Sequence, residues 1–337
     1  MGLVVGAGAL ALGCGNKSAG GASGSASGAG AGKGALRIAV IPKGTTHEFW
    51  KSVHAGAVKA ARELGVEPLW KGPLKEDDLK EQIGIVEGFA AEGVSGIVLA
   101  PLNDKALATS VKNAVRAGVP VVVFDSGLTG EEHASFVATN NKVAGKLAGE
   151  RLGKLVAGAE KKNVLLLRYL EGSASTSERE AGFLEGIGSS EGVKVASDNQ
   201  YGGATTDSAM SASESLLLAQ GADKGEVAGV FCPNESTTFG MLLALRKLGL
   251  AGKVKLVGFD ASAKLVAALS EGHVDGLVVQ NPFQMGYLAV KTMVSVIRGE
   301  KVERLIDTGA RLVDRDNMGA PEVKELLHPN LAVWLDE

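Results

Sequence analysis

The chain has 337 residues, of which 45% are hydrophobic and 22% charged, and its formal net charge is -3. This length is enough to bury substantial cores in two domains of ordinary size. The slightly acidic balance, without a basic stripe interleaved with aromatic residues, argues against a nucleic-acid partner.

The amino-terminal residues differ from everything that follows. An apolar stretch from Leu3 to Leu12 is too short to span a bilayer, has the length of a signal peptide's apolar region and runs into Cys14. It resembles a bacterial lipoprotein signal, although Ala11 stands where leucine is commoner and no Lys or Arg precedes the apolar run. We expect residues 1–14 to be a signal peptide lipidated at Cys14, the alternative being an ordinary amino-terminal leader.

Residues 15–35 form a tract rich in Gly, Ser and Ala that cannot bury enough apolar surface to fold and is typical of a flexible tether. Its segment Gly30-Ala31-Gly32-Lys33-Gly34 is similar to the end of a phosphate-binding loop. However, Ser27 replaces that motif's first glycine, Gly34 replaces its hydroxyl residue, and no strand precedes it. We therefore interpret the segment as linker.

From Leu36 onward, short apolar runs alternate with longer segments whose apolar residues lie three and four apart. The runs predict strands over Leu36–Ile41, Ile97–Ala100, Val119–Phe124, Ala134–Ala138, Asn163–Leu167, Val227–Cys232, Val254–Phe259 and Gly276–Val279. The longer segments predict helices, among them His47–Leu64, Asp77–Glu92, Asp104–Ala117, Lys142–Val156, Thr205–Ala219, Ser236–Leu248 and Phe283–Arg298. Glycines stand where helix C-caps are expected, at Gly65, Gly118, Gly249 and Gly299. This alternation predicts an α/β fold of parallel sheets with helices on both faces.

Cys232 ends one of the predicted strands and has no second cysteine to pair with once Cys14 is assigned to lipid. No disulfide and no cysteine metal site is then expected within the chain. We interpret Cys232 as a small buried hydrophobe. A nucleophile is the alternative, disfavoured because no histidine neighbours it in sequence.

Two of the predicted strands end in Phe-Asp followed by small residues, at Phe124-Asp125 and Phe259-Asp260. Open α/β sheets bind ligands at the carboxyl ends of their strands. One such acid in each half of the chain indicates one ligand held between two lobes. Capping of the following helices or completion of turns is the alternative role for both acids.

Several segments in order carry a family resemblance: Thr46-His47-Glu48-Phe49-Trp50, Gly96 to Pro101, Gly118 to Asp125, Arg179 to Phe183, Phe231 to Glu235, Val257 to Asp260, and Gln280. From Leu36 to about Asn317, the chain resembles the type I periplasmic binding proteins of the ribose and galactose class, the solute receptors of ABC importers. The resemblance implies two similar doubly wound, Rossmann-like lobes joined by a three-segment hinge. It implies a monomer without cofactor or metal that closes on a solute and delivers it to a permease.

The lobe boundaries follow from the pattern of strands and from this resemblance. The first crossover is expected near Thr139, and the chain returns to the first lobe after Gln280. We assign residues 36–139 plus 281–310 to the amino-terminal lobe and 140–280 plus 311–337 to the carboxy-terminal lobe.

The matched positions carry the chemistry of a polyol site without a catalyst. Carboxylates, amides and a guanidinium satisfy sugar hydroxyls, and aromatic rings cover the C–H face; the candidates are Asp125, Asp260, Asn234, Gln280 and Arg179 for the first role and Phe49 and Trp50 for the second. Phe49 shares the apolar helix face of Val53 and Ala57, so core packing competes for it and Trp50 is the better stacking candidate. Arg179 has a surface pairing with Glu178 or Glu180 as its alternative. His47, Ser126 and Asn141 complete the expected site, His47 with a solvated helix start as its alternative.

Departures from the family pattern bear on the ligand. Ser126 stands where ribose-type receptors usually carry Arg, Ala100 where they often carry Asn, and His47 where Asn is typical. In the region where such receptors commonly place an aromatic ring over the second face of the sugar, Tyr201 is the only aromatic residue. We expect a cleft that is wider or less polar at these points than a pentose site, suited to a larger or substituted sugar or another small polar solute.

The function expected from these residues is an extracytoplasmic sugar-binding lipoprotein of an ABC importer, held at the membrane of the periplasm or cell envelope through its lipid alone. A receptor that carries a sugar or autoinducer signal to a sensor kinase or chemoreceptor is the alternative. A repressor-type regulator would need a helix-turn-helix where the signal and tether stand. An enzyme is not expected, because no nucleotide-binding glycine motif follows the first strand, which leads into Pro42-Lys43-Gly44-Thr45.

Overall fold

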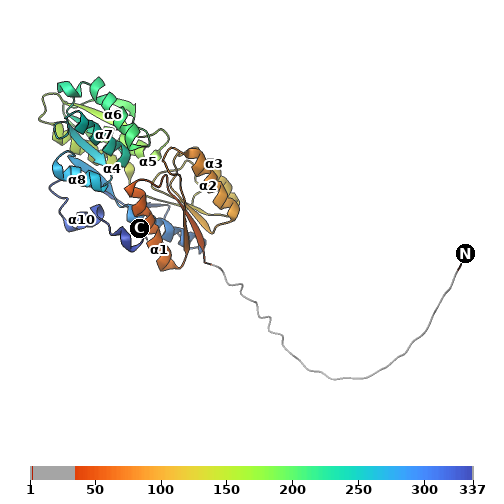
Figure 1. Cartoon of the computed structure of the whole chain (residues 1–337). Coiled ribbons are helices and arrows are strands. Elements are labelled where there is room, and N and C mark those ends of the chain that lie inside the picture. The colour runs from red at the N-terminus through yellow and green to blue at the C-terminus, as the bar shows by residue number, and fades with distance from the viewer. Residues whose placement is uncertain (1, 3–34, 336–337) are drawn as a thin grey trace. The chain divides into compact units, whose positions relative to one another are not determined.

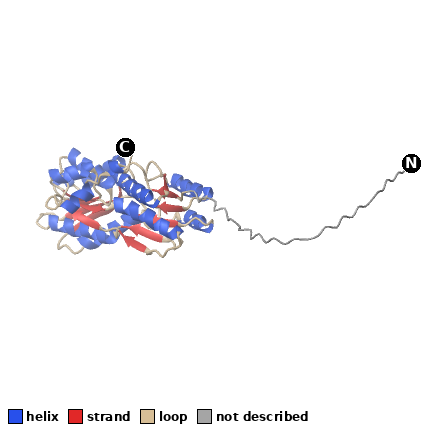
Figure 2. Cartoon of the chain, turned by 90° about the horizontal axis from the view of Figure 1, so that it is seen from below, coloured by secondary structure: helices blue, strands red, loops and turns tan. Residues whose placement is uncertain are grey.

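The computed structural model describes Gly2 and residues 35–335. The predicted signal peptide, its lipidated Cys14 and the tether up to Gly34 lie outside these residues. The described chain from Ala35 onward belongs to one compact unit, built on two six-stranded sheets. Figure 2 shows helices on both sides of the strands.

The first sheet has the order β11-β5-β4-β3-β1-β2, and its strands are parallel throughout. Its strands are β1 (Arg37–Ile41), β2 (Glu67–Trp70), β3 (Gly96–Leu99), β4 (Val121–Phe124), β5 (Ser135–Ala138) and β11 (Leu305–Asp307). One face packs on α1 (Glu48–Leu64) and α9 (Pro282–Ile297). The other packs on α2 (Leu79–Glu92) and α3 (Ala108–Arg116) (Figure 1).

The second sheet repeats this plan with the order β12-β10-β9-β8-β6-β7. Its strands are β6 (Asn163–Arg168), β7 (Lys194–Tyr201), β8 (Gly229–Phe231), β9 (Lys255–Phe259), β10 (Gly276–Gln280) and β12 (Ala310–Val313). The helices α4 (Asn141–Val156) and α5 (Ala174–Ile187) cover one face. The other face carries α6 (Thr206–Ala219), α7 (Glu235–Lys247), α8 (Ala263–Glu271) and α10 (Pro321–Leu327). Short 3-10 turns are η1 (Ala222–Lys224) and η2 (Leu331–Val333).

The chain passes between the two sheets three times: between β5 and α4, between β10 and α9, and between β11 and β12. The predicted α/β fold of two doubly wound lobes is confirmed. One strand departs from the expected parallel arrangement, because β12 pairs antiparallel to β10. In addition, η2 contacts α1 of the first lobe, where Arg62 donates to the carbonyl oxygens of Val333 and Trp334 at 3.2 Å. The residues around η2, which the prediction assigns to the second lobe, therefore contact the first lobe as well.

Glycines allow the closest helix pairs to approach. A Cβ added at Gly145 of α4 would lie 2.0 Å from the carbonyl oxygen of Arg179 on α5. In the first lobe, a Cβ at Gly56 of α1 would lie 1.9 Å from the carbonyl oxygen of Phe283 on α9. Only glycine fits at such contacts, and the first of them brings α4 against the turn of α5 that carries Arg179.

Among residues 35–335, no helix combines the length and the apolar character needed to cross a membrane. Cys232 is fully buried in the core of the second lobe beside Leu165 and Val230, and burial raises the pKa of its thiol. This confirms its interpretation as a small buried hydrophobe, because a thiol without thiolate character is a poor nucleophile.

Candidate functional site

Asp125 and Asp260 occupy equivalent places at the carboxyl ends of β4 and β9. Within the described chain they are the only residues other than glycine with positive φ, 59° and 69°. Asp tolerates this left-handed conformation better than most residues. Neither side chain caps the helix that follows it: Asn140 caps α4, and α8 begins at Ser262 without a side-chain cap. The capping alternative for the pair is therefore wrong.

The side chain of Asp260 is buried among donors of its own lobe. Its Oδ1 accepts from Gln280 Nε2 at 2.7 Å, and its Oδ2 accepts from the backbone N–H of Glu235 at 3.1 Å. Burial raises the pKa of Asp260, although Arg179 and these donors act in the opposite direction. The Asp260 carboxylate is thus held in a fixed orientation at the strand end.

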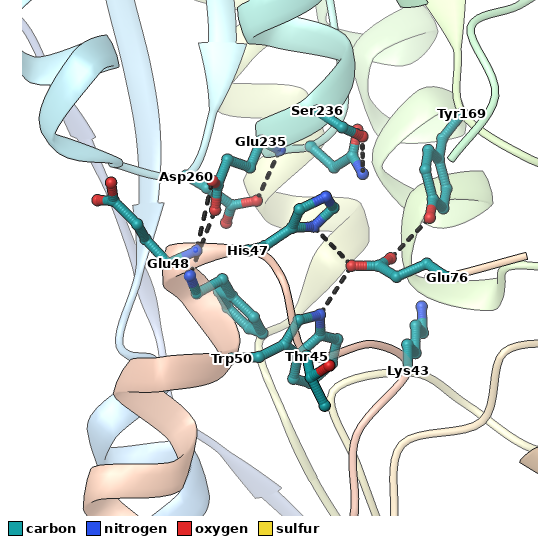
Figure 3. A network of polar contacts seen from close by, with 12 residues as sticks. Lys43, Thr45, His47, Glu48, Trp50, Glu76, Tyr169, Glu235, Ser236 and Asp260 are labelled. Carbon is teal, nitrogen blue, oxygen red and sulfur yellow. Dashed lines mark hydrogen bonds and ion pairs between the residues drawn. The ribbon is translucent and has the colours of Figure 1, made fainter. Parts of the chain in front are cut away.

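A second buried carboxylate, Glu76, lies at the centre of a network in the loop between β2 and α2 (Figure 3). Its Oε1 accepts from Trp50 Nε1 at 2.7 Å and pairs with His47 Nδ1 at 2.6 Å. Its Oε2 accepts from the hydroxyl of Tyr169 at 2.6 Å. Because Tyr169 follows β6 in the second lobe, Glu76 joins the two lobes.

The His47–Glu76 pair is charged near neutral pH. Burial alone would lower the pKa of His47, but the Glu76 carboxylate outweighs it and raises this pKa to about 9. Burial alone would raise the pKa of Glu76, but His47 and Lys43 lower it to about 2. Burial and Glu76 also raise the pKa of Tyr169, which keeps its hydroxyl a donor.

Lys43, at the carboxyl end of β1, supplies a buried cation beside Asp125. Its Nζ lies 3.5 Å from Asp125 Oδ2 and donates to Ser173 and Ser175 of the second lobe, both at 3.1 Å. Although Ser126 stands where ribose-type receptors usually carry Arg, a cation from another strand end therefore lies beside Asp125. Ser126 instead accepts from the backbone N–H of Ser175 at 3.1 Å.

Arg179 lies on α5 with its guanidinium nine-tenths or more buried. It donates to Asn141 Oδ1 at 2.8 Å and to the carbonyl oxygen of Pro233 at 3.0 Å, and it stacks 3.9 Å from the Phe259 ring centroid. Its surface pairing with Glu178 or Glu180 is not formed; Glu180 pairs with Arg168 at 2.7 Å. Asn141, the Pro233 carbonyl oxygen and the Phe259 ring thus orient Arg179 together.

The helix-face interpretation of the two aromatics is reversed. Trp50 is 3% exposed, belongs to the core of the first lobe and packs edge-on against Phe124, whereas Phe49 is half-buried. Both rings nevertheless line the same cavity. The first turn of α1 faces this cavity as well as the core, so a single apolar face does not describe it.

A cavity between the lobes collects these groups. All the predicted site residues except Ser126 and Asn141 line it, namely His47, Phe49, Trp50, Asp125, Arg179, Asn234, Asp260 and Gln280. Sequence reasoning missed six lining residues: Lys43, Glu76, Tyr169, Ser175, Thr176 and Glu235. Most of the lining residues are polar or charged. Tyr201 is 48% exposed and does not line the cavity.

Residues 38–301 match the family model of the periplasmic binding protein domain. The chain belongs to the periplasmic binding protein family. The ribose import binding protein of Escherichia coli is 29% identical over 282 residues, which cover 82% of this chain and 90% of that protein. A carbohydrate transporter solute binding protein from Agrobacterium radiobacter, solved with D-arabinose, is 34% identical with a TM-score of 0.83, covering 88% and 100% of the two chains.

A further periplasmic binding protein, an ABC transporter solute binding protein from Agrobacterium vitis solved with bound D-fucose, is 31% identical with a TM-score of 0.79. The aligned region covers 87% of this chain and 100% of that one. These matches confirm the predicted membership of the type I periplasmic binding proteins of the ribose and galactose class. The members of this family are substrate-binding proteins and not enzymes, so the chain is a binding protein.

Proposed function

We propose that this periplasmic binding protein is the extracytoplasmic substrate-binding lipoprotein of an ABC importer and that it captures a sugar or similar small polyol in the interlobe cavity. One observation carries the proposal. Arg179 Nη2 and Gln280 Oε1 are buried, line the cavity and have no hydrogen-bond partner among the described residues. One is a donor and the other an acceptor, and leaving both unpaired is costly. A hydroxyl-rich solute supplies both partners, because each hydroxyl donates and accepts.

The charges around the cavity favour a neutral solute. Lys43, His47 and Arg179 are cations, and they face the carboxylates of Glu76, Asp125 and Asp260. These three cations balance the three carboxylates, and burial raises the pKa of Glu235, the fourth acid of the lining, to about 7, so a charged ligand would add an uncompensated charge to a buried site. The relatives solved with D-arabinose and D-fucose, both neutral monosaccharides, support the same class.

Capture proceeds by closure of the lobes. Lys43 reaches Ser173 and Ser175, and Tyr169 reaches Glu76, across the cavity. These bonds join groups from opposite lobes, so opening the cleft separates them, and the three connections between the sheets serve as the hinge. A permease that recognises the paired lobes would then receive only the loaded form.

Thermal-shift screening of a panel of monosaccharides and polyols tests the ligand class. A ligand that binds only the native state at 100 times its Kd stabilises that state by about 2.7 kcal/mol, which raises Tm by roughly 5 °C or more. We expect at least one neutral monosaccharide to do this and sugar acids and amino sugars to have no effect. A panel in which only charged solutes raise Tm would contradict the neutral class, and one in which no sugar or polyol does would contradict sugar binding.

Cell fractionation tests the lipid anchor. Replacing Cys14 removes the thiol that would be lipidated, so Cys14→Ser is expected to move the protein from the membrane fraction to the soluble fraction. Cys232→Ser is the matched control, because Cys232 is buried in the second lobe and its loss should leave the protein in the membrane fraction. Membrane association of the Cys14→Ser variant would contradict the lipoprotein assignment.

A further inference from the structure

Two helices that face each other across the cleft begin without a cap of their own. The N-cap residues are His47 for α1 and Ser262 for α8, and neither makes a side-chain capping hydrogen bond. By contrast, Asn234 caps α7 and Thr205 caps α6 with their own side chains. Because the first backbone N–H groups of a helix have no partner within it, α1 and α8 need acceptors from elsewhere.

Those acceptors come from the opposite lobe, and Figure 3 shows Glu235 beside the start of α1. Glu48 of α1 accepts from the backbone N–H of Ala263, the first residue of α8, at 2.8 Å. Glu235, the first residue of α7 in the second lobe, accepts from the backbone N–H groups of Phe49 and Glu48 at 3.3 and 3.4 Å. Each lobe therefore places a carboxylate on the first turn of a helix in the other, where the helix dipole also favours negative charge.

We propose that Glu48 and Glu235 are positioning residues that hold the closed cleft by reciprocal helix capping. Opening the lobes breaks both caps together and returns the amide groups to water. The caps therefore slow opening and lengthen the residence of the ligand. The proposal rests on the lobe closure proposed above and assigns it a specific set of hydrogen bonds.

Replacing Glu48 tests the effect of the cap without changing a side chain that contacts the ligand. It is exposed and does not line the cavity, so its replacement leaves every lining side chain in place. Glu235 does line the cavity and faces His47, Glu48 and Asp260, so its replacement would mix the two effects. Glu48 is accordingly the residue to test.

Stopped-flow tryptophan fluorescence, to which Trp50 in the cavity lining contributes, measures ligand release from the full chain, with the sugar that raises Tm as the probe. A helix cap contributes about 1 kcal/mol, so Glu48→Ala is expected to speed release about five-fold, with association little changed. Glu48→Gln keeps an acceptor oxygen and should restore most of the slow release. Glu81→Ala is the matched control, because Glu81 is an exposed acid in the first turn of α2. Equal release rates for wild type and Glu48→Ala would overturn the proposal.

A measurement without sugar separates this proposal from the proposed function. Spin labels at Thr109→Cys and Ser177→Cys, exposed positions on α3 and α5, report the distance between the lobes in a Cys14→Ser background. The ligand-free chain should show a smaller closed population when Glu48 is replaced by alanine. Identical distance distributions would overturn the capping proposal, whatever the ligand. If no sugar binds but the distributions differ, the sugar proposal fails and the capping proposal stands.

Discussion

Asp260→Ala is expected to abolish calorimetric binding of the cognate sugar while leaving the protein folded. The Asp260 carboxylate is 6% exposed, lines the cavity and holds Gln280 through a 2.7 Å hydrogen bond. Its loss removes its own bonds to the sugar and frees Gln280 to turn away. Hydrogen bonds to a charged group contribute about 1.5–3 kcal/mol each, so the loss of two weakens binding by at least about 100-fold.

Asp275→Ala is the matched control for this experiment. Asp275 is also a buried acid of the second lobe that accepts from one side chain, Lys255 at 3.0 Å, and one backbone N–H, that of Leu256 at 3.1 Å. It does not line the cavity. Its replacement should lower the free energy of unfolding without changing the Kd for the sugar. Unchanged affinity in Asp260→Ala would remove Asp260 from the site.

Glu76→Gln is expected to have the second largest effect, on both stability and binding. Removing one partner of a buried ion pair costs about 3–5 kcal/mol, because His47 must then either stay charged without its counter-charge or release its proton. Urea unfolding should show this loss in the free energy of unfolding at pH 7. Sugar affinity should also fall, because the Gln amide keeps one acceptor oxygen in place of two, so Trp50 and Tyr169 cannot both keep the acceptor that fixes them.

The same pair gives a pH dependence whose sign follows from the two pKa values. The pKa of His47 is raised from 6.5 to about 9, so its stabilisation is complete below pH 6.5 and is lost as pH rises through 9. The pKa of Glu76 is lowered from 4.5 to about 2, so its contribution is lost only as pH falls from 4.5 through 2. An NMR titration of His47 should give a midpoint near 9 in the wild type and a clearly lower midpoint in Glu76→Gln.

Glu185→Gln serves as the control for Glu76→Gln. Glu185 pairs with Lys142 and Lys146 on the surface, at 3.1 and 2.9 Å. Exposed pairs of this kind add little to stability, so the variant should unfold like the wild type. A wild-type His47 midpoint near 6.5, or a Glu76→Gln protein as stable as Glu185→Gln, would contradict the buried charged pair.

The interior strands and their ends were predictable from the sequence, and the edge strands were not. The strands β3, β4 and β9 are buried on both faces and therefore read as continuous apolar runs, which placed Asp125 and Asp260. The four strands that the pattern missed, β2, β7, β11 and β12, are the four edges of the two sheets. Half-exposed edges such as β7, with the sequence KVASDNQY, carry polar residues and give no apolar run.

The site residues that the prediction missed either follow an unpredicted edge strand or stand at strand ends to which the strand-end rule was not applied. Glu76 comes after the unpredicted edge strand β2, so no pattern marked its loop as a part of the site. Lys43 and Tyr169, in contrast, stand just after β1 and β6, where the rule that found Asp125 also applies. The indole N–H of Trp50 donates to Glu76. Because Glu76 was not recognised as a site residue, the burial of Trp50 could not be inferred.

A crystal structure of the protein with the sugar that raises its Tm tests capture between the lobes most directly. We predict one sugar molecule in the interlobe cavity, with hydroxyl groups within hydrogen-bond distance of Asp125, Asp260, Arg179 Nη2 and Gln280 Oε1. The lobes should be closed around it, with Glu48 on the first turn of α8. A sugar bound elsewhere on the molecule, with Arg179 Nη2 and Gln280 Oε1 still unpaired, would contradict the proposed function.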